Sequence, residues 1–233
     1  MPARLRSQPL TLQSTTESSR HPSRSAAHGR WWWKRPLDLV VAGALLLLLL
    51  PLIGALVLLI RRDSDGPGLY RQRRIGRDGR PFDMWKLRTM TVGCDEAPHR
   101  AVAADWFEGR DRDGRFKTLD DPRVTAVGRW LRRSNLDELP QLVNVVRGEM
   151  SLVGPRPAIP YELDHYEPWY FERLQAPPGI TGLWQVSGRG GLAAAEMMEL
   201  DRRYVRVATL WLDLRILLWT GPALLLGLVK DGL

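Results

Sequence analysis

Two adjacent carboxylates, Asp137 and Glu138, have the residue types and spacing needed to handle a phosphoryl group. Asn135 followed by Glu138 fits a capping box, so both acids are expected at a helix N-terminus. Unpaired N–H groups at a helix start favour a bound phosphate. Adjacent carboxylates can also divide the work, one attacking phosphorus and the other handling a metal ion or a proton. The alternative is that both acids only complement the helix dipole, and the local pattern alone favours that structural role.

Basic side chains near the acid pair could balance the charge of a phosphate. Arg132 lies a few residues upstream and could do so directly. Arg156 stands between Pro155 and Pro157, and an arginine on such a rigid loop suits bidentate phosphate contact, although an extended solvent loop is an equal alternative. A further strip of basic residues could bind lipid headgroups or a diphosphate, but solvated strand faces are the default for such residues. The strip consists of Arg71, Arg73, Arg74, Arg77, Lys86 and Arg88.

A glycine-rich segment over residues 177–191 is a third candidate, because glycine lets the backbone approach a nucleotide closely. It contains Gln185 and Arg189. It matches neither a P-loop nor the dinucleotide-binding fingerprint. An ordinary surface loop is therefore the alternative.

The elements that must position these residues follow from turn signals and apolar periodicity. Leu69–Ile75 and residues 82–87 flank an Asp78-Gly79 turn and predict a β-hairpin. Residues 91–122 predict a long polar loop with one short helix. Longer helices are predicted over residues 125–133, 139–147 and 193–207. The fold class indicated is mixed α/β and mainly helical.

An apolar run over residues 37–60 predicts a membrane segment, and aromatic residues followed by Lys34 and Arg35 mark its interface. At about 1.5 Å per residue the run is roughly 36 Å long, enough to cross a bilayer. However, Pro51 would kink the helix, and basic residues flank both ends, whereas the positive-inside rule places them on one side. A re-entrant hairpin bent at Pro51 and a kinked spanning helix both fit the residues.

A second apolar stretch, over residues 211–229, is interrupted by Gly221 and Pro222. Its uninterrupted pieces are too short to cross a bilayer. They predict helices that pack on the domain or lie in the membrane interface.

The chain has 233 residues and a net charge of +8, and its isoelectric point is about 10.2. Residues 1–36 hold seven basic residues against one acidic residue, so most of the excess lies in an N-terminal tail. That distribution argues against nucleic-acid binding and for an anionic membrane surface. Residues 1–30 are predicted to be disordered. The single cysteine, Cys94, excludes an internal disulfide, and the four histidines show no metal-ligand spacing.

Taken in order, these segments resemble the bacterial sugar transferases that prime glycan assembly on polyprenyl phosphate, the monotopic phosphoglycosyl transferases. The resemblance begins near Lys34 and is to the short catalytic form of the family. It is carried by residues 34–39, the apolar run with Pro51, residues 65–67, 72–76, 86–90 and 137–142, Asn144, residues 151–157 and 178–189, Asp201, Tyr204 and Asp213. Two positions depart from the pattern, where Leu50 and Asn135 stand in place of common serines.

The resemblance implies a location and a reaction. It implies an N-terminal re-entrant helix over residues 31–62 and a catalytic domain with interfacial helices over residues 63–233. The active site would lie on the cytoplasmic face of the bacterial inner membrane. Asp137 would attack the β-phosphorus of a UDP-sugar and release UMP. Polyprenyl (undecaprenyl) phosphate would then resolve the phosphosugar-enzyme intermediate, which primes exopolysaccharide, O-antigen or glycoconjugate assembly.

The resemblance also implies roles for residues and partners. Asp137 and Glu138 would hold Mg²⁺, with Glu138 as the partner in metal binding or proton handling. The predicted phosphate-binding residues are Lys86, Arg88, Arg132 and Arg156. Those predicted near the nucleotide or sugar are Pro155, Pro157, Gln185 and Arg189. A homodimer is compatible with the sequence, no nucleic-acid partner is expected, and the sugar is not specified. The alternative function is an inactive membrane-anchored scaffold of a glycan-assembly complex.

Overall fold

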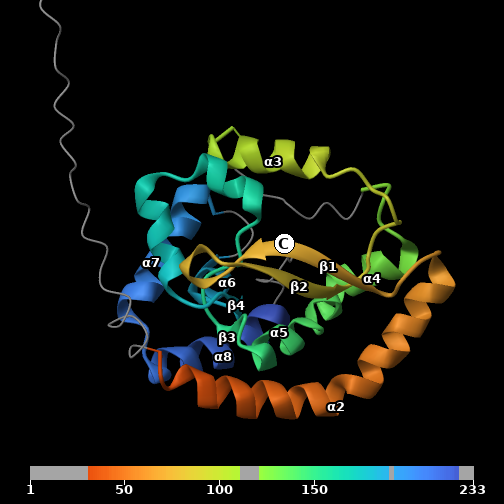
Figure 1. Ribbon diagram of the computed structural model, residues 1–233, viewed down its shortest axis with the longest axis horizontal. Coiled ribbons are helices and arrows are strands. Elements are labelled where there is room, and N and C mark those ends of the chain that lie inside the picture. Colours follow the sequence, from red (N-terminus) through yellow and green to blue (C-terminus); the bar gives the residue numbers. More distant parts are fainter. Residues whose placement is uncertain (1–30, 111–120, 189–191, 226–233) are drawn as a thin grey trace, which may run out of the picture. The chain divides into compact units, whose positions relative to one another are not determined.

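A 30-residue helix, α2 (Lys34–Asp63), runs along one side of the protein. The computed structural model describes residues 31–110, 121–188 and 192–225. Figure 1 shows that α2 bends part-way along its length. Pro51 lies inside the helix, where its ring removes one backbone hydrogen bond and favours a kink. The helix nevertheless continues from one side of Pro51 to the other, so the predicted membrane segment is one bent helix.

The two sides of α2 differ sharply in burial. The inner side packs Ala42, Ile53 and Ile60 against the rest of the chain. The outer side exposes large apolar residues, among them Leu47 and Leu48, which are 76% and 74% exposed. Among the described residues, α2 is the one helix long and apolar enough to cross a membrane. A contiguous apolar surface of this kind marks contact with an apolar environment.

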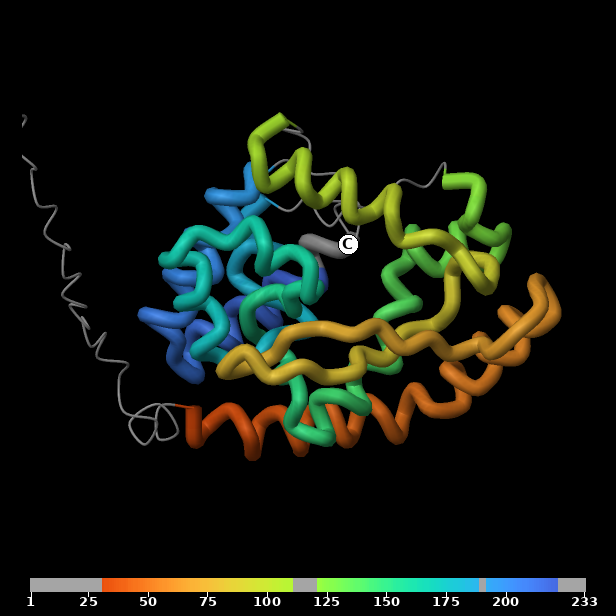
Figure 2. Tube along the Cα trace, turned by 45° about the horizontal axis from the view of Figure 1, so that its top comes forward, coloured from red at the N-terminus to blue at the C-terminus, as the bar shows by residue number. Residues whose placement is uncertain are grey.

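The predicted β-hairpin is confirmed as β1 (Leu69–Ile75) and β2 (Pro81–Leu87), which pair antiparallel. A short 3₁₀ turn, η1 (Arg77–Gly79), joins them. Asp78 and Gly79 have φ values of 57° and 72°, which is the conformation an Asp-Gly turn supplies. Figures 1 and 2 show the hairpin lying between α2 on one side and α3 (Ala97–Phe107) on the other.

A second, very small sheet pairs β3 (Ser151–Val153) parallel with β4 (Gly179–Thr181). The two backbones approach so closely that a Cβ on Gly154 would lie 2.3 Å from the carbonyl oxygen of Pro177. Only glycine fits there. This contact brings the Pro155-Arg156-Pro157 loop beside the segment that precedes α6.

The remaining elements are mostly short helices. Their bounds are α4 (Ala126–Ser134), η2 (Leu136–Glu138), α5 (Gln141–Arg147), η3 (Pro160–His165), η4 (Pro168–Gln175), α6 (Leu183–Gly188), α7 (Ala194–Val207) and α8 (Leu210–Leu225). The helices predicted over residues 125–133, 139–147 and 193–207 are confirmed within two residues at their starts. The main core lies where α5 packs between the hairpin and α2, with Met84, Leu142 and Val145 at its centre. The observed fold is thus mixed α/β and mainly helical.

A buried polar cluster fastens the N-terminal end of α2. Lys34 Nζ donates to Asp213 Oδ2 at 2.5 Å, to the Val153 carbonyl oxygen at 2.7 Å and to Ser151 Oγ at 3.1 Å. Asp38 Oδ1 accepts from the Leu152 N–H at 2.9 Å. The sequence had placed Lys34 at a membrane interface, and the structure gives it protein partners instead. Because those partners lie more than 100 residues away along the chain, no local pattern indicated them.

Arg35, also predicted at the interface, has protein partners too. Its guanidinium donates to the carbonyl oxygens of Val145 and Val146 at 2.8 and 2.7 Å, at the C-terminal end of α5. Helix C-termini leave such carbonyl groups without helical partners, and an arginine satisfies them well.

The C-terminal end of α2 is fastened by Arg88, which follows β2. Its guanidinium donates to Ser64 Oγ and the Ser64 carbonyl oxygen, both at 2.8 Å, and to the Pro67 carbonyl oxygen at 2.7 Å. Both ends of α2 are therefore bound by the same globular part, and Trp31 onward belongs to one compact unit.

Candidate active site

The acid pair lies in a single 3₁₀ turn, η2, between α4 and α5. Asn135 ends α4 in the left-handed conformation, with φ 54° and ψ 17°, which asparagine tolerates better than most residues. Its side chain makes no capping hydrogen bond. The predicted capping box is therefore wrong, because Asn135 turns the backbone instead of capping a helix. Asp137 and Glu138 do precede α5, which begins at Gln141.

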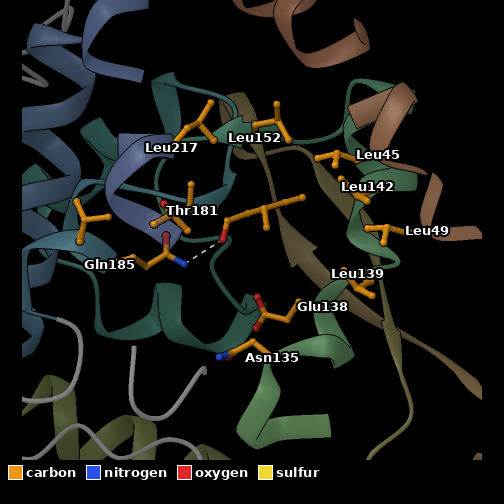
Figure 3. A pocket seen from close by; sticks show the side chains of 13 residues that line it. Leu45, Leu49, Asn135, Glu138, Leu139, Leu142, Leu152, Thr181, Gln185 and Leu217 are labelled. Carbon is orange, nitrogen blue, oxygen red and sulfur yellow. Dashed lines mark hydrogen bonds between the residues drawn. The ribbon is translucent and has the colours of Figure 1, made fainter. Parts of the chain in front are cut away.

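Successive residues of a 3₁₀ turn point about 120° apart, so the two acids face different compartments. Asp137 lines a polar cavity of about 430 Å³. Glu138 lines an apolar pocket of about 250 Å³, shown in Figure 3, and a small polar pocket of about 30 Å³. Lys86 borders both the polar cavity and the small pocket, and its Nζ lies 3.7 Å from Glu138 Oε1.

Arg132 and Asp137 both line the polar cavity. Arg132 Nε donates to Thr89 Oγ1 at 3.0 Å. Burial lowers the pKa of Arg132, while the Asp137 and Asp121 carboxylates oppose that shift. Gly128 makes the placement possible, because a Cβ there would lie 2.1 Å from the Thr89 carbonyl oxygen. The close packing of α4 on Thr89 thus directs Arg132 into the cavity.

The predicted basic strip divides between the two faces of the hairpin. Alternate strand residues point to opposite faces. Arg73 pairs with Asp83 on one face, at 3.2 Å, and both side chains are half exposed. Arg74 and Lys86 lie on the other face and line the polar cavity. The strip is therefore not one binding surface.

Arg156 lies in the small pocket together with Lys86 and Glu138. Its Nη1 donates to both carboxylate oxygens of Glu162, at 3.0 and 2.9 Å. Burial alone would raise the pKa of Glu162, but the Arg156 and Arg74 guanidinium groups hold it below its usual range. The buried carboxylate therefore stays ionised and fixes the direction of Arg156.

The carbonyl oxygens of the prolines on either side of Arg156 accept hydrogen bonds that hold the loop in place. The Gly179 N–H donates to the Pro155 carbonyl oxygen at 2.8 Å, and Arg74 Nη1 donates to the Pro157 carbonyl oxygen at 2.7 Å. Burial, with help from the like charge of Arg156, lowers the pKa of Arg74 to about 10. The loop is thus held to β4 and β1, and is not an extended solvent loop.

His99 and Tyr161 also line the polar cavity, and neither was predicted as a site residue. Tyr161 Oη and His99 Nδ1 are 2.5 Å apart. Burial, with help from Arg156 and Arg74, lowers the pKa of His99 to about 4, and burial raises the pKa of Tyr161 to about 12. Both side chains are therefore neutral at pH 7.

The remaining predicted site residues fall in different places. Arg88 borders the polar cavity, but its guanidinium is hydrogen-bonded to the segment after α2. Gln185 lines both the apolar pocket and the small pocket. Arg189 lies outside the described residues. Arg74 was predicted only as one member of the basic strip, and strand alternation with Lys86 could have singled it out. Glu162 was not predicted as a site residue, and no local signal marks it.

The carboxylates of Asp137 and Glu138 suit Mg²⁺ as ligands that act together with a bound phosphate. Among the described residues no three His, Cys, Asp or Glu side chains gather as a metal cluster. Asp137 and Glu138 offer hard carboxylate oxygens, and Mg²⁺ is commonly bound by one or two carboxylates together with substrate phosphates and water. The acid pair could therefore hold the ion once a phosphate is bound.

Comparisons with known proteins identify the family to which this chain is similar. Residues 29–227 match the model of the family described as bacterial sugar transferase. The chain is 44% identical over 195 residues to the UDP-galactose-lipid carrier transferase of Erwinia amylovora, covering 84% of this chain and 41% of that protein. It is 45% identical over 200 residues to the UDP-glucose:undecaprenyl-phosphate glucose-1-phosphate transferase of Caulobacter vibrioides, covering 82% of this chain and 69% of that protein. It is 40% identical over 194 residues to the exopolysaccharide production protein ExoY of Rhizobium meliloti, covering 83% of this chain and 86% of that protein. The chain thus spans less than half the length of its longer relatives.

Proposed function

Because this chain belongs to the bacterial sugar transferase family, we propose that it moves a sugar phosphate from a UDP-sugar to polyprenyl phosphate. The observation that carries the proposal is the position of the acid pair between a polar cavity and an apolar pocket. A nucleotide sugar fits the first environment and a lipid the second. The names of the relatives support UDP-glucose or UDP-galactose as donor and undecaprenyl phosphate as acceptor.

In the first step an Asp137 carboxylate oxygen attacks the β-phosphorus of the donor. The bond from that phosphorus to the bridging oxygen breaks, and UMP leaves with the electron pair. An aspartyl phosphosugar remains on the enzyme. In the second step a phosphate oxygen of the lipid attacks the same phosphorus, and the Asp137 carboxylate is released.

The basic residues offset the charge that moves in both steps. Arg132 lies on the Asp137 side, Arg156 lies on the Glu138 side, and Lys86 borders both. Fixed cations in a water-poor site stabilise a phosphoryl group in flight more than they would in water. Bound Mg²⁺, held by the acid pair, would supply further neutralisation of phosphate charge. Glu138, beside Lys86, would help hold the ion or accept a proton.

The proposal includes a membrane position for α2. Both ends of α2 are bound by the same globular part, through Lys34 and Arg88. A helix of 30 residues is about 45 Å long, so a straight spanning helix would place those ends on opposite sides of a bilayer. The shared attachment supports entry and exit at one face. We place that face on the cytoplasmic side of the inner membrane, where UDP-sugars are made available to the enzyme.

The test is a trapping experiment with the variant Asp137→Asn. Purified protein is incubated with Mg²⁺ and UDP-glucose or UDP-galactose, first without and then with undecaprenyl phosphate. The wild-type chain should release UMP and gain the mass of one hexose phosphate on the peptide that contains Asp137. Asp137→Asn should lose at least about a thousandfold in transfer, as nucleophile removal does elsewhere.

A matched control is Asp83→Asn, which removes an exposed acid on the other hairpin face. It should retain activity. Full activity of Asp137→Asn would overturn the assignment of the nucleophile. Absence of UMP release from the wild-type chain with every UDP-sugar would favour the scaffold function instead.

A further inference from the structure

An apolar pocket opens beside Glu138 between α2, α5 and α8 (Figure 3). Its apolar lining comes from widely separated parts of the chain, including Leu45 and Leu49 of α2, Leu142 of α5, Leu152 of β3 and Leu217 of α8. Figure 3 shows Glu138 and Asn135 together at one end, with Leu152 and Leu217 at the other. A pocket with one charged end and apolar walls suits a ligand with a polar head and a hydrocarbon tail.

The charged end of the apolar pocket leads into the small polar pocket. Glu138, Ile180 and Gln185 line both. The small pocket is also lined by Lys86 and Arg156, the cations that a phosphate head would need. A ligand could therefore place its hydrocarbon among the leucines and its phosphate beside the two cations.

The polar cavity, where the donor is proposed to bind, also borders the small pocket. It shares Arg74 and Lys86 with the small pocket. Among the described residues it shares no lining residue with the apolar pocket. Within the part of the chain that the structure describes, the small pocket borders both larger compartments, and Lys86 stands there beside Glu138.

Gln185 is an independent indication of a binding site. It is 8% exposed, and its Nε2 donates to the Ile180 carbonyl oxygen at 3.0 Å. Its Oε1 is buried and has no hydrogen-bond partner among the described residues. A buried acceptor left unsatisfied costs about 1–3 kcal/mol. The monoprotonated form of a phosphate monoester, which loses its last proton with a pKa of about 6, would supply the donor.

The mouth of the pocket is continuous with the apolar outer side of α2. Leu45 lines the pocket and is still 38% exposed. Its neighbours Leu47 and Leu48 point outward into the exposed apolar surface. A lipid could therefore enter from the membrane without crossing water.

We propose, building on the proposed function, that the apolar pocket holds the isoprenoid units nearest the phosphate of the acceptor lipid. The acceptor phosphate passes Glu138 and Gln185 and reaches Lys86 and Arg156. The donor occupies the polar cavity on the Asp137 side. Because the two substrates use separate compartments, the first step runs with the acceptor pocket empty, and blocking that pocket affects the second step alone.

The experiment compares Leu45→Trp with Leu47→Trp, two identical changes on the same helix. The first fills the pocket and the second faces outward. Formation of the aspartyl phosphosugar from the UDP-sugar and its discharge to undecaprenyl phosphate are measured separately. We expect Leu45→Trp to form the adduct at the wild-type rate and to raise the KM for undecaprenyl phosphate at least tenfold. Leu47→Trp should leave both within twofold.

A photoreactive group on the first isoprenoid unit of the acceptor provides a second measurement on the wild-type chain. It should label the peptides that contain Leu45 or Leu217. Labelling confined to the outward side of α2, or a wild-type acceptor KM in an adduct-forming Leu45→Trp, would overturn the acceptor pocket. Loss of adduct formation in the wild-type chain would instead overturn the proposed function, so the two failures are distinguishable.

Discussion

Replacing Lys34 with methionine tests whether this residue is a buried structural cation. Lys34 is 2% exposed, and its ammonium lies 2.5 Å from Asp213, which is 1% exposed. Methionine preserves much of the side-chain volume but leaves the Asp213 carboxylate buried without its cation. Breaking a buried pair from one side costs about 3–5 kcal/mol. For a chain of this size each kcal/mol lowers Tm by about 2–4 °C, so the expected decrease is roughly 6–20 °C.

The assay is thermal unfolding in detergent, followed by tryptophan fluorescence. Arg62→Met is the matched control, since it removes an exposed positive charge from the same helix. The double variant Lys34→Met/Asp213→Asn should recover part of the loss, because it also removes the unbalanced charge. The reasoning is refuted if Lys34→Met unfolds within about 2 °C of Arg62→Met. Weaker binding of that variant to anionic vesicles would then identify Lys34 as a headgroup contact.

Three further results are expected. Glu162→Gln should slow adduct formation and lower Tm, because it removes the carboxylate charge that faces the buried Arg156, at a cost of about 3–5 kcal/mol. The control Glu167→Gln, which changes an exposed residue, should alter neither adduct formation nor Tm. His99 has a pKa of about 4 in the folded chain and near 6.5 when unfolded, so its contribution to stability is complete above pH 6.5 and is lost as the pH falls toward 4. His99→Gln should flatten that part of a Tm-versus-pH curve, and His165→Gln should not. Gly128→Ala should destabilise the chain by about 1–3 kcal/mol, because its Cβ would meet the Thr89 carbonyl oxygen at 2.1 Å, and should raise the KM for the donor by displacing α4. The control Gly54→Ala should be tolerated, because a Cβ at Gly54 meets nothing within 4 Å.

Turn residues and apolar periodicity predicted correctly the elements whose conformation depends on neighbouring residues in the sequence. The Asp78-Gly79 turn defines the hairpin because its residues supply positive φ without help from elsewhere. The helix over residues 193–207 shows the same agreement between pattern and structure. The capping box predicted at Asn135 was wrong because asparagine suits both a helix cap and a left-handed turn. Only the packing of α4 against α5 decides between the two conformations.

Local patterns singled out Asp137 in a turn and Arg156 on a rigid loop, and both side chains line cavities, so these candidate positions could be read from the sequence. The site was not predictable where buried charges pair across the fold. Glu162 binds Arg156 inside a 3₁₀ segment whose sequence resembles any polar loop. Lys34 was misplaced for the same reason, because its cationic end beside an apolar run is also typical of a membrane anchor.

The attachment of Lys34 to Asp213 has a consequence for how the protein is made. The two residues are 179 positions apart, so at about 5–20 residues per second a ribosome adds the second one roughly 9–36 s after the first. During that interval the nascent α2 meets the bilayer with a Lys34 ammonium whose acidic partner does not yet exist. The buried ion pair of Lys34 therefore forms only after α8 is synthesised and folds back onto α2, although Arg35 and Asp38 of α2 can reach their partners earlier. A chain interrupted before α8 never completes this attachment, which gives cellular proteases a physical basis for distinguishing unfinished copies from finished ones.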